Sequence, residues 1–236
     1  MSNLYWLTDE QMARLRPFFP KSHGKPRVDD RRVLSGIIFM NRNGLRWSDA
    51  PKEYGPAKTL YNRWKRWGDM GEDGNDRRDL SQSTPHGFEP WVEKGGRGRL
   101  IGRTKGGMNT KLHAVTDENG RPISFFMSAG EASDYTGAAA LLNSLPPAQW
   151  LLADRGYDAD WFREGLQNKG IKPCIPGRKS RAKPVKYDKR RYKRRNRIEI
   201  MFGRLKDWRR VATRYDRCPK VFLSAIALAA TVLFWL

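Results

Sequence analysis

The segment Tyr192–Lys206, with the sequence YKRRNRIEIMFGRLK, organises the C-terminal part of this 236-residue chain. Ile198, Phe202 and Leu205 recur at spacings of four and three residues. This is the period of a helix that buries one apolar face. The segment is therefore predicted to be helical, with that face against a core.

A second pattern on this segment is polar. Four side chains recur at spacings of three, four and seven residues and so share one helical face: Tyr192, Arg195, Glu199 and Lys206. One carboxylate in a basic helix usually belongs to a solvated face with ion pairs. Here the cations outnumber the carboxylate, which indicates a further anion, and a second carboxylate, Asp154, follows an apolar run upstream.

This spacing of tyrosine, arginine, glutamate and lysine resembles the signature of DDE-type transposases from bacterial insertion sequences. The resemblance covers Leu4–Trp67 and Gly98–Leu236 and is interrupted between them. It implies an α/β fold, in which a ribonuclease-H-like catalytic domain is preceded by a small all-α helix-turn-helix domain. The expected boundaries are a DNA-binding domain at 1–70, an irregular linker at 71–98 and the transposase domain at 99–236.

Charge agrees with such a function. The chain has 46 Lys and Arg against 25 Asp and Glu, a formal net charge of +21 and a pI of about 10.4. A protein this basic most often binds a polyanion, and nucleic acid is the first candidate. We expect double-stranded DNA, both element ends and target, as the partner, and no small-molecule substrate; a homodimer stays open.

The cysteines and the apolar C-terminal run limit the cellular location that we expect. The two cysteines, Cys174 and Cys218, have no zinc-ligand spacing, and a disulfide is not expected in the cytosol. The apolar run Val221–Leu236 is shorter than the roughly 20 residues of a membrane span, so it is interpreted as a buried terminal helix. The expected location is the cytoplasm of a bacterium, on DNA.

Three helices are predicted in the N-terminal part. The first begins after Thr8, which forms a capping box with Gln11, the second covers Asp30–Asn41, and the third begins at Thr59. The third buries Leu60, Trp64 and Trp67 and exposes a polar face, which consists of Asn62, Arg63, Lys65 and Arg66. That face favours a DNA-reading helix, and a small bundle with a solvated charged face is the alternative.

Strands and helices alternate in the C-terminal part. The predicted order is a hairpin of Lys111–Val115 and Pro122–Met127, a helix at Asp134–Leu145, a strand at Trp150–Ala153, a helix at Ala159–Lys169 and a strand at Ile171–Ile175. The continuous apolar run Trp150–Ala153 indicates a strand buried on both faces. His113, alone on its strand, is interpreted as structural or substrate-facing rather than as a metal ligand.

The implied chemistry requires carboxylates. Two Mg²⁺ (or Mn²⁺) ions about 3.5–4 Å apart activate the attacking oxygen and stabilise the leaving one in phosphodiester cleavage. Asp154 and Glu199 are the predicted catalytic and metal-ligating residues, supported by Tyr192, Arg195 and Lys206. The third carboxylate, which the resemblance implies on the central strand, is missing.

The expected position of that strand falls in Glu72–Val92, which has no apolar period and is predicted to be irregular. Asp73, Asp76 and Asp79 have no strand residues beside them and are poor substitutes. Back-translation of Asn75–Pro90 with chosen synonymous codons gives, in another frame, MIDATYLKAHRTASS, which looks like the missing strand. Our hypothesis is that this stretch is translated out of the ancestral frame, together with a deletion.

A basic track precedes the C-terminal helix, with Tyr187 and Tyr192 interleaved. Its predicted DNA contacts are Arg178, Lys179, Arg181, Arg190, Arg191, Lys193 and Arg194. A disordered solvated tail is the alternative. The sequence thus predicts a DNA transposase, catalytically impaired in this copy, and the alternative is a non-catalytic protein that occupies element ends and competes with active transposase. A basic RNA-binding protein ranks third.

Overall fold

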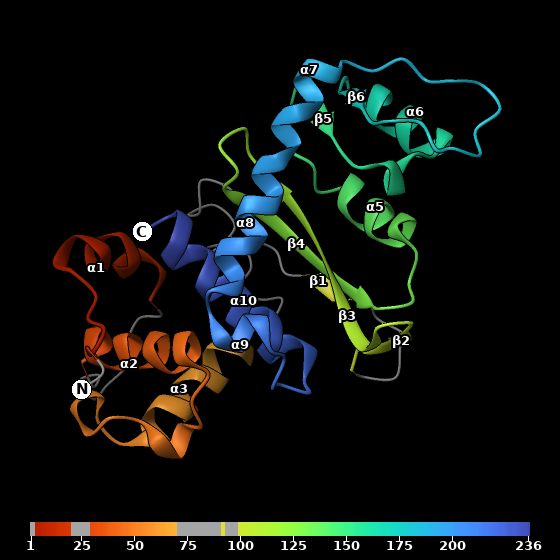
Figure 1. The fold of residues 1–236 in the computed structure, drawn as a ribbon. Helices are drawn as coiled ribbons and strands as arrows, with labels where there is room; N and C mark the ends of the chain where they lie inside the picture. The colour runs from red at the N-terminus through yellow and green to blue at the C-terminus, as the bar shows by residue number, and fades with distance from the viewer. Residues whose placement is uncertain (1–2, 20–28, 70–90, 93–98) are drawn as a thin grey trace. The chain divides into compact units, whose positions relative to one another are not determined.

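A computed structural model describes residues 3–19, 29–69, 91–92 and 99–236 (Figure 1). The chain divides into two compact units. The helical unit combines Met1–Phe88 with Gly203–Leu236, and the sheet unit is Glu89–Phe202. The sequence had suggested 99–236 as one domain, whereas here the last 34 residues belong with the N-terminal helices.

Helices and short turns make up the described part of the helical unit. They are α1 (Asp9–Leu15), η1 (Arg16–Phe18), α2 (Asp30–Asn43), η2 (Trp47–Asp49), η3 (Lys52–Tyr54), α3 (Ala57–Asp69), α9 (Arg209–Ala212) and α10 (Pro219–Phe234). The predicted capping box begins α1, since Thr8 and Gln11 bond to each other's backbone N–H groups. Gly44 ends α2 with φ of 64°, a left-handed conformation that favours glycine.

One apolar core explains why the two ends of the chain join. Ile37 and Met40 of α2, Leu60 of α3 and Ala225 of α10 belong to one buried cluster. Burial of such side chains stabilises a fold by about 25 cal/mol per Å² of apolar surface. The prediction of a buried terminal helix is therefore confirmed for one face of α10, and no helix in the described ranges is long and apolar enough to cross a membrane.

The strands of the sheet unit form two separate sheets. The first has the order β1-β4-β3-β2, and its strands are β1 (Trp91–Val92), β2 (Gly102–Thr104), β3 (Gly107–Thr116) and β4 (Pro122–Ala129). The second pairs β5 (Trp150–Leu152) with β6 (Lys172–Cys174) in parallel. The helical elements are α5 (Asp134–Leu142), η4 (Arg155–Tyr157), α6 (Asp160–Asn168), α7 (Lys189–Tyr192), η5 (Lys193–Arg195) and α8 (Asn196–Lys206), the last of which continues past Phe202 (Figure 1).

The β3–β4 hairpin, α5, α6 and β6 agree with the predicted order. Three details differ. β5 is half-buried rather than buried on both faces, and Trp91 and Val92 form a strand parallel to β4 instead of irregular chain. The segment Tyr192–Lys206 is not one helix, because η5 interrupts it. The rest of the predicted linker, 71–90 and 93–98, lies outside the described residues.

Candidate active site

Asp154 lies two residues after the end of β5. It caps the turn η4, because its Oδ1 accepts a hydrogen bond from the Gly156 N–H at 2.8 Å. The side chain is exposed. A carboxylate at the carboxyl end of a strand, fixed by the backbone and open to solvent, can meet a substrate or an ion.

A second carboxylate, which the sequence analysis did not select, lies beside it. A Cβ placed on Gly156 would be 2.5 Å from Asp134 Oδ2 and 2.9 Å from Asp154 Oδ1. Both carboxylates therefore converge on the space that only glycine leaves open. Asp134, in the first turn of α5, is also paired with Lys111 Nζ at 3.1 Å, so its charge is partly neutralised.

Three of the four members of the polar face, Tyr192, Arg195 and Glu199, lie close together before and within α8. Arg195 forms an ion pair with Glu199, and its guanidinium lies 5.7 Å from the centre of the Tyr192 ring. Burial opposes the charge of Arg195, but Tyr192, Glu199 and Asp154 together raise its pKa. Both predicted catalytic carboxylates, Glu199 and Asp154, therefore stabilise the charged form of the Arg195 guanidinium. Lys206 is exposed at the end of α8.

These residues do not fit a two-ion metal centre. In the ranges 3–19, 29–69 and 99–236, no three histidine, cysteine or acidic side chains form a group that could hold a metal ion. Glu199 and Asp134 are each paired with a cation. The candidate acids of the linker, Asp73, Asp76 and Asp79, fall outside the described residues. That Asp154 and Glu199 share one ion stays a prediction.

His113 has a structural position, in line with the sequence interpretation. Its Nδ1 lies 2.9 Å from the Tyr157 hydroxyl and its Nε2 lies 3.0 Å from Ser128 Oγ, so both ring nitrogens are engaged. The ring is buried, and burial lowers the pKa of His113 below its usual value. We conclude that the imidazole holds β3 against η4.

Asp158 organises the start of the basic track. Its side chain is 1% exposed and accepts hydrogen bonds from Arg163 at 2.8 Å, Arg181 at 3.1 Å and the backbone N–H of Arg178 at 2.7 Å. Burial would raise the pKa of Asp158, but these bonds outweigh it and lower the pKa. The Arg178 guanidinium also donates to the Gly156 carbonyl at 2.9 Å.

Two of the predicted DNA contacts, Arg178 and Arg181, therefore have internal partners. A third, Arg191, lies over the Trp150 ring at 4.4 Å from its centre. The remaining four are exposed: Lys179, Arg190, Lys193 and Arg194. The part of the track that is available to phosphate is thus smaller than the sequence suggested.

The polar face of α3 requires one correction. Arg63 was expected to point outward, but its Nη1 lies 2.7 Å from Asp30 Oδ1 and its side chain is only 13% exposed. Its guanidinium also lies 5.5 Å from the centre of the Trp67 ring. Arg63 therefore joins α3 to α2. The exposed residues of α3 in the described range include Lys58 and Tyr61, which the sequence analysis missed, together with the expected Asn62, Lys65 and Arg66.

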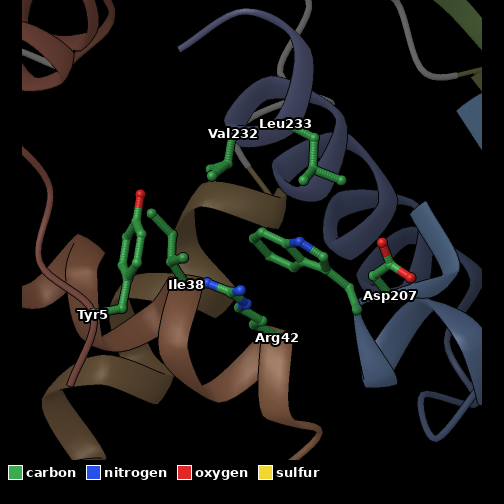
Figure 2. A pocket seen from close by; sticks show the side chains of 7 residues that line it. Tyr5, Ile38, Arg42, Asp207, Val232 and Leu233 are labelled. Atoms are coloured by element: carbon green, nitrogen blue, oxygen red, sulfur yellow. The ribbon is translucent and has the colours of Figure 1, made fainter. Parts of the chain in front are cut away.

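The helical unit also contains a small cavity of about 160 Å³ (Figure 2). Its lining mixes apolar, aromatic and charged side chains: Tyr5, Ile38, Arg42, Asp207, Trp208, Val232 and Leu233. The single cation and the single anion of this lining offset each other, so the cavity does not favour phosphate.

Comparisons with known proteins agree with these observations. Residues 7–72 match a family of putative transposases of the IS4/5 family, and residues 151–236 match a transposase DDE domain. A putative transposase for insertion sequence element IS6501 from Brucella ovis is 35% identical over 130 residues, which are 55% of this chain and 99% of the relative. The chain belongs to the insertion-sequence transposases.

Two further relatives extend this result. A putative transposase for insertion sequence element IS402 from Burkholderia cepacia is 28% identical over 156 residues, covering 58% of this chain and 72% of the relative. An uncharacterised protein from Sinorhizobium fredii is 37% identical over 68 residues, 28% of this chain and 54% of the relative. No solved structure matches the chain. The mixture of helices and sheets suits a DDE transposase domain.

Proposed function

We propose that this transposase binds double-stranded DNA but does not cut it. The observation that carries the proposal is an imbalance between two kinds of group. Cations are exposed on α3 and along the basic track, whereas in the part of the chain that the structure describes no three acidic side chains gather around Asp154 to hold a metal ion. Binding of element ends would then be retained without cleavage, and competition with active transposase would follow.

The exposed face of α3 supports the binding step. Lys58, Tyr61, Asn62 and Lys65 fall at helical spacings of three, four and seven, so they form one stripe of donors and cations with an aromatic ring. The major groove, roughly 12 Å wide, admits a helix of this kind. Asn62 can contact base edges, while Lys65 and Arg66 contact phosphates.

The basic track supports a second set of phosphate contacts. Asp158 fixes the beginning of the loop through its hydrogen bonds with Arg178 and Arg181. The backbone on either side of Lys179 is therefore held in place. Anchoring lowers the entropy lost when the loop meets DNA. Arg190, Lys193 and Arg194 follow on α7 and η5 and are exposed.

A second candidate function, a cleavage-competent transposase, is favoured by family membership and by the contact of Arg195 with Glu199. The DDE family implies a divalent ion such as Mg²⁺ or Mn²⁺, which would activate an attacking oxygen. Asp154 and Glu199 would be its ligands in this chain. The two functions differ in one respect, namely whether a third carboxylate completes the site.

DNA binding tests the first part. We would measure the affinity for a duplex carrying an element end from 50 to 300 mM salt, comparing the chain with Lys65→Ala, Arg66→Ala and Glu199→Ala. Each lost phosphate contact should weaken binding and reduce the salt slope by about 1, whereas Glu199→Ala should bind at least as well because it removes a negative charge. The proposal would be contradicted if the affinity did not depend on the salt concentration and were unchanged in both Lys65→Ala and Arg66→Ala.

Plasmid nicking tests the second part. A supercoiled plasmid with the element ends should stay intact in Mg²⁺ or Mn²⁺, with no difference between the chain and Asp154→Ala. Metal-dependent nicking at the ends that disappears in Asp154→Ala would show that the present carboxylates suffice. In that case the hypothesis of a cleavage-competent transposase would replace that of a protein that binds DNA without cutting it.

A further inference from the structure

The start of β3 extends beyond the end of β4. Pairing between β3 and β4 runs from Thr116 to Thr110, where Thr110 is opposite Ala129. The three preceding residues of β3 pair with β2 instead, so Gly102–Asn109 is a two-stranded ribbon that continues past the end of β4 (Figure 1). Below we call these residues the ribbon.

Local hydrogen bonds hold the ribbon in shape. Thr104 Oγ1 donates to the Gly107 carbonyl at 3.1 Å and accepts from Asn109 Nδ2 at 2.8 Å. Gly107 has φ of 102°, which a residue with a side chain rarely adopts, and a Cβ there would meet nothing within 4 Å. The Gly130 N–H donates to the Asn109 carbonyl at 3.2 Å and so fixes the base of the ribbon to β4. The ribbon is therefore a preorganised projection.

Its side chains combine an apolar group with cations. Met108 is 66% exposed, the highest value among the exposed large hydrophobic residues of the described chain. Arg103 is its cross-strand partner, so the two side chains leave the same face next to each other. Lys105 is exposed at the tip, and Gly106 and Gly107 add no side-chain bulk there. A thioether flanked by two cations on a narrow tip suits a polyanion with an apolar interior, which describes duplex DNA.

We propose that the ribbon enters the minor groove of double-stranded DNA and that Met108 inserts between adjacent base pairs. The inference rests on the proposed DNA-binding function and adds a site to it. The minor groove is roughly 6 Å wide, so a tip formed by two glycines enters more easily than a substituted one. Apolar wedges that include Met unstack one base step and kink the duplex by about 20–90°. Arg103 and Lys105 neutralise the phosphates on either side.

DNA bending measures the wedge separately from binding. A duplex of about 30 base pairs with a donor and an acceptor dye at its ends reports the kink as a change in energy transfer. The protein should raise the transfer, and Met108→Ala should lose at least half of that change at saturating protein while binding only a few-fold more weakly. Met108→Leu, which keeps an apolar wedge, should bend nearly as well as the parent.

Ile200→Ala is the matched control, since Ile200 is another exposed hydrophobic residue, at 56%, on α8. It should bend DNA like the parent. Equal melting temperatures for the three variants would show that the fold is intact. A minor-groove-binding polyamide should compete with the bend.

Two results would overturn the inference. Saturated complexes of the parent could leave the duplex straight, or Met108→Ala could bend it as fully as the parent; in either case the salt-dependent binding through α3 would still stand. Failure of the proposed function looks different, because then the parent would show no salt-dependent binding to the duplex and Arg66→Ala would change nothing.

Discussion

The Nδ1 atom of His113 lies 2.9 Å from the hydroxyl oxygen of Tyr157, and this bond joins β3 to η4, the turn that follows β5. His113 belongs to β3, and Tyr157 ends the turn that follows β5 and Asp154. A Cβ on Gly137 of α5 would lie 2.3 Å from the same nitrogen, so the ring is enclosed on that side too. The position of Asp154 therefore depends on a titratable side chain.

Stability should consequently fall on mild acidification. Burial lowers the pKa of His113 in the folded state, whereas in the unfolded state it is 6.5. Below that value the unfolded chain binds more protons than the folded one, so the free energy of unfolding decreases from about pH 7 downward until the folded pKa is reached. Urea unfolding between pH 5 and 8 measures this. His113→Gln should unfold more easily at pH 7.5 and show a shallower pH dependence over this range, and an unchanged slope would contradict the assignment.

Arg63 should support the fold rather than contact DNA. It is paired with Asp30 at 2.7 Å on a mostly buried side of α3. Arg63→Ala leaves the carboxylate without this partner and should reduce the free energy of unfolding by about 1–3 kcal/mol. Arg66→Ala, on the exposed face, should change it by no more than about 0.5 kcal/mol.

DNA titrations complete this comparison. At a temperature where both variants are folded, Arg63→Ala should keep the salt slope of the parent, and Arg66→Ala should lose about one unit of it. The reverse pattern would return Arg63 to the DNA-contacting face.

Local patterns predicted much of this fold. The capping box of Thr8 and Gln11 is such a signal, because both of its hydrogen bonds lie within four residues. The inward orientation of the Arg63 side chain could also have been predicted. Arg63 is three residues after Leu60 and four before Trp67, and both of these side chains face inward. Its charge led us to place it outside.

Other features depend on contacts between distant residues. Asp134 begins α5 like any acidic residue in a first turn, and only the tertiary fold brings it to Gly156 and Asp154. In the same way, the apolar composition of α10 predicted burial but not its partner, the core around Ile37 and Leu60. Half-burial of β5 was not predictable from its apolar run, since it depends on which strands are present to cover it.

Asp158 should make stability sensitive to stronger acid. Hydrogen bonds from Arg163, Arg181 and the Arg178 N–H lower its folded pKa below the unfolded value of 3.8. The stabilisation is therefore present above about pH 4 and is lost as the pH falls toward the folded pKa. Asp158→Asn should cost about 3–5 kcal/mol at pH 7, since it removes the buried carboxylate that pairs with Arg163 and Arg181.

Asp160 provides the control, because it also pairs with Arg181 but is 85% exposed. Asp160→Asn should cost no more than about 1 kcal/mol. Urea unfolding at pH 7 and pH 3 separates the two: the difference between the parent and Asp158→Asn should shrink at pH 3. A constant difference would show that packing, not charge, explains the effect.

Restoring the alternative frame should join the two sheets. Along Thr110–Thr116, β3 pairs with β4 on one side, and β5 pairs with β6 on one side; in the described chain no further strand pairs with the other edge of either. The His113–Tyr157 bond already brings these parts of the chain together. A strand between them would add backbone hydrogen bonds to both edges and carry its aspartate toward Asp154. Replacement of Asn75–Pro90 by MIDATYLKAHRTASS provides that strand.

The replaced chain should show slower amide hydrogen exchange in β3 and β5, and it should gain Mg²⁺- or Mn²⁺-dependent nicking of a plasmid with element ends. The matched control is the same peptide with asparagine in place of its aspartate. This control should keep the slower exchange, because the strand is present, but lose the nicking, because the third carboxylate is absent. Exchange in β3 and β5 that is as fast as in the original chain would refute the frame hypothesis, since the peptide would then not form the missing strand.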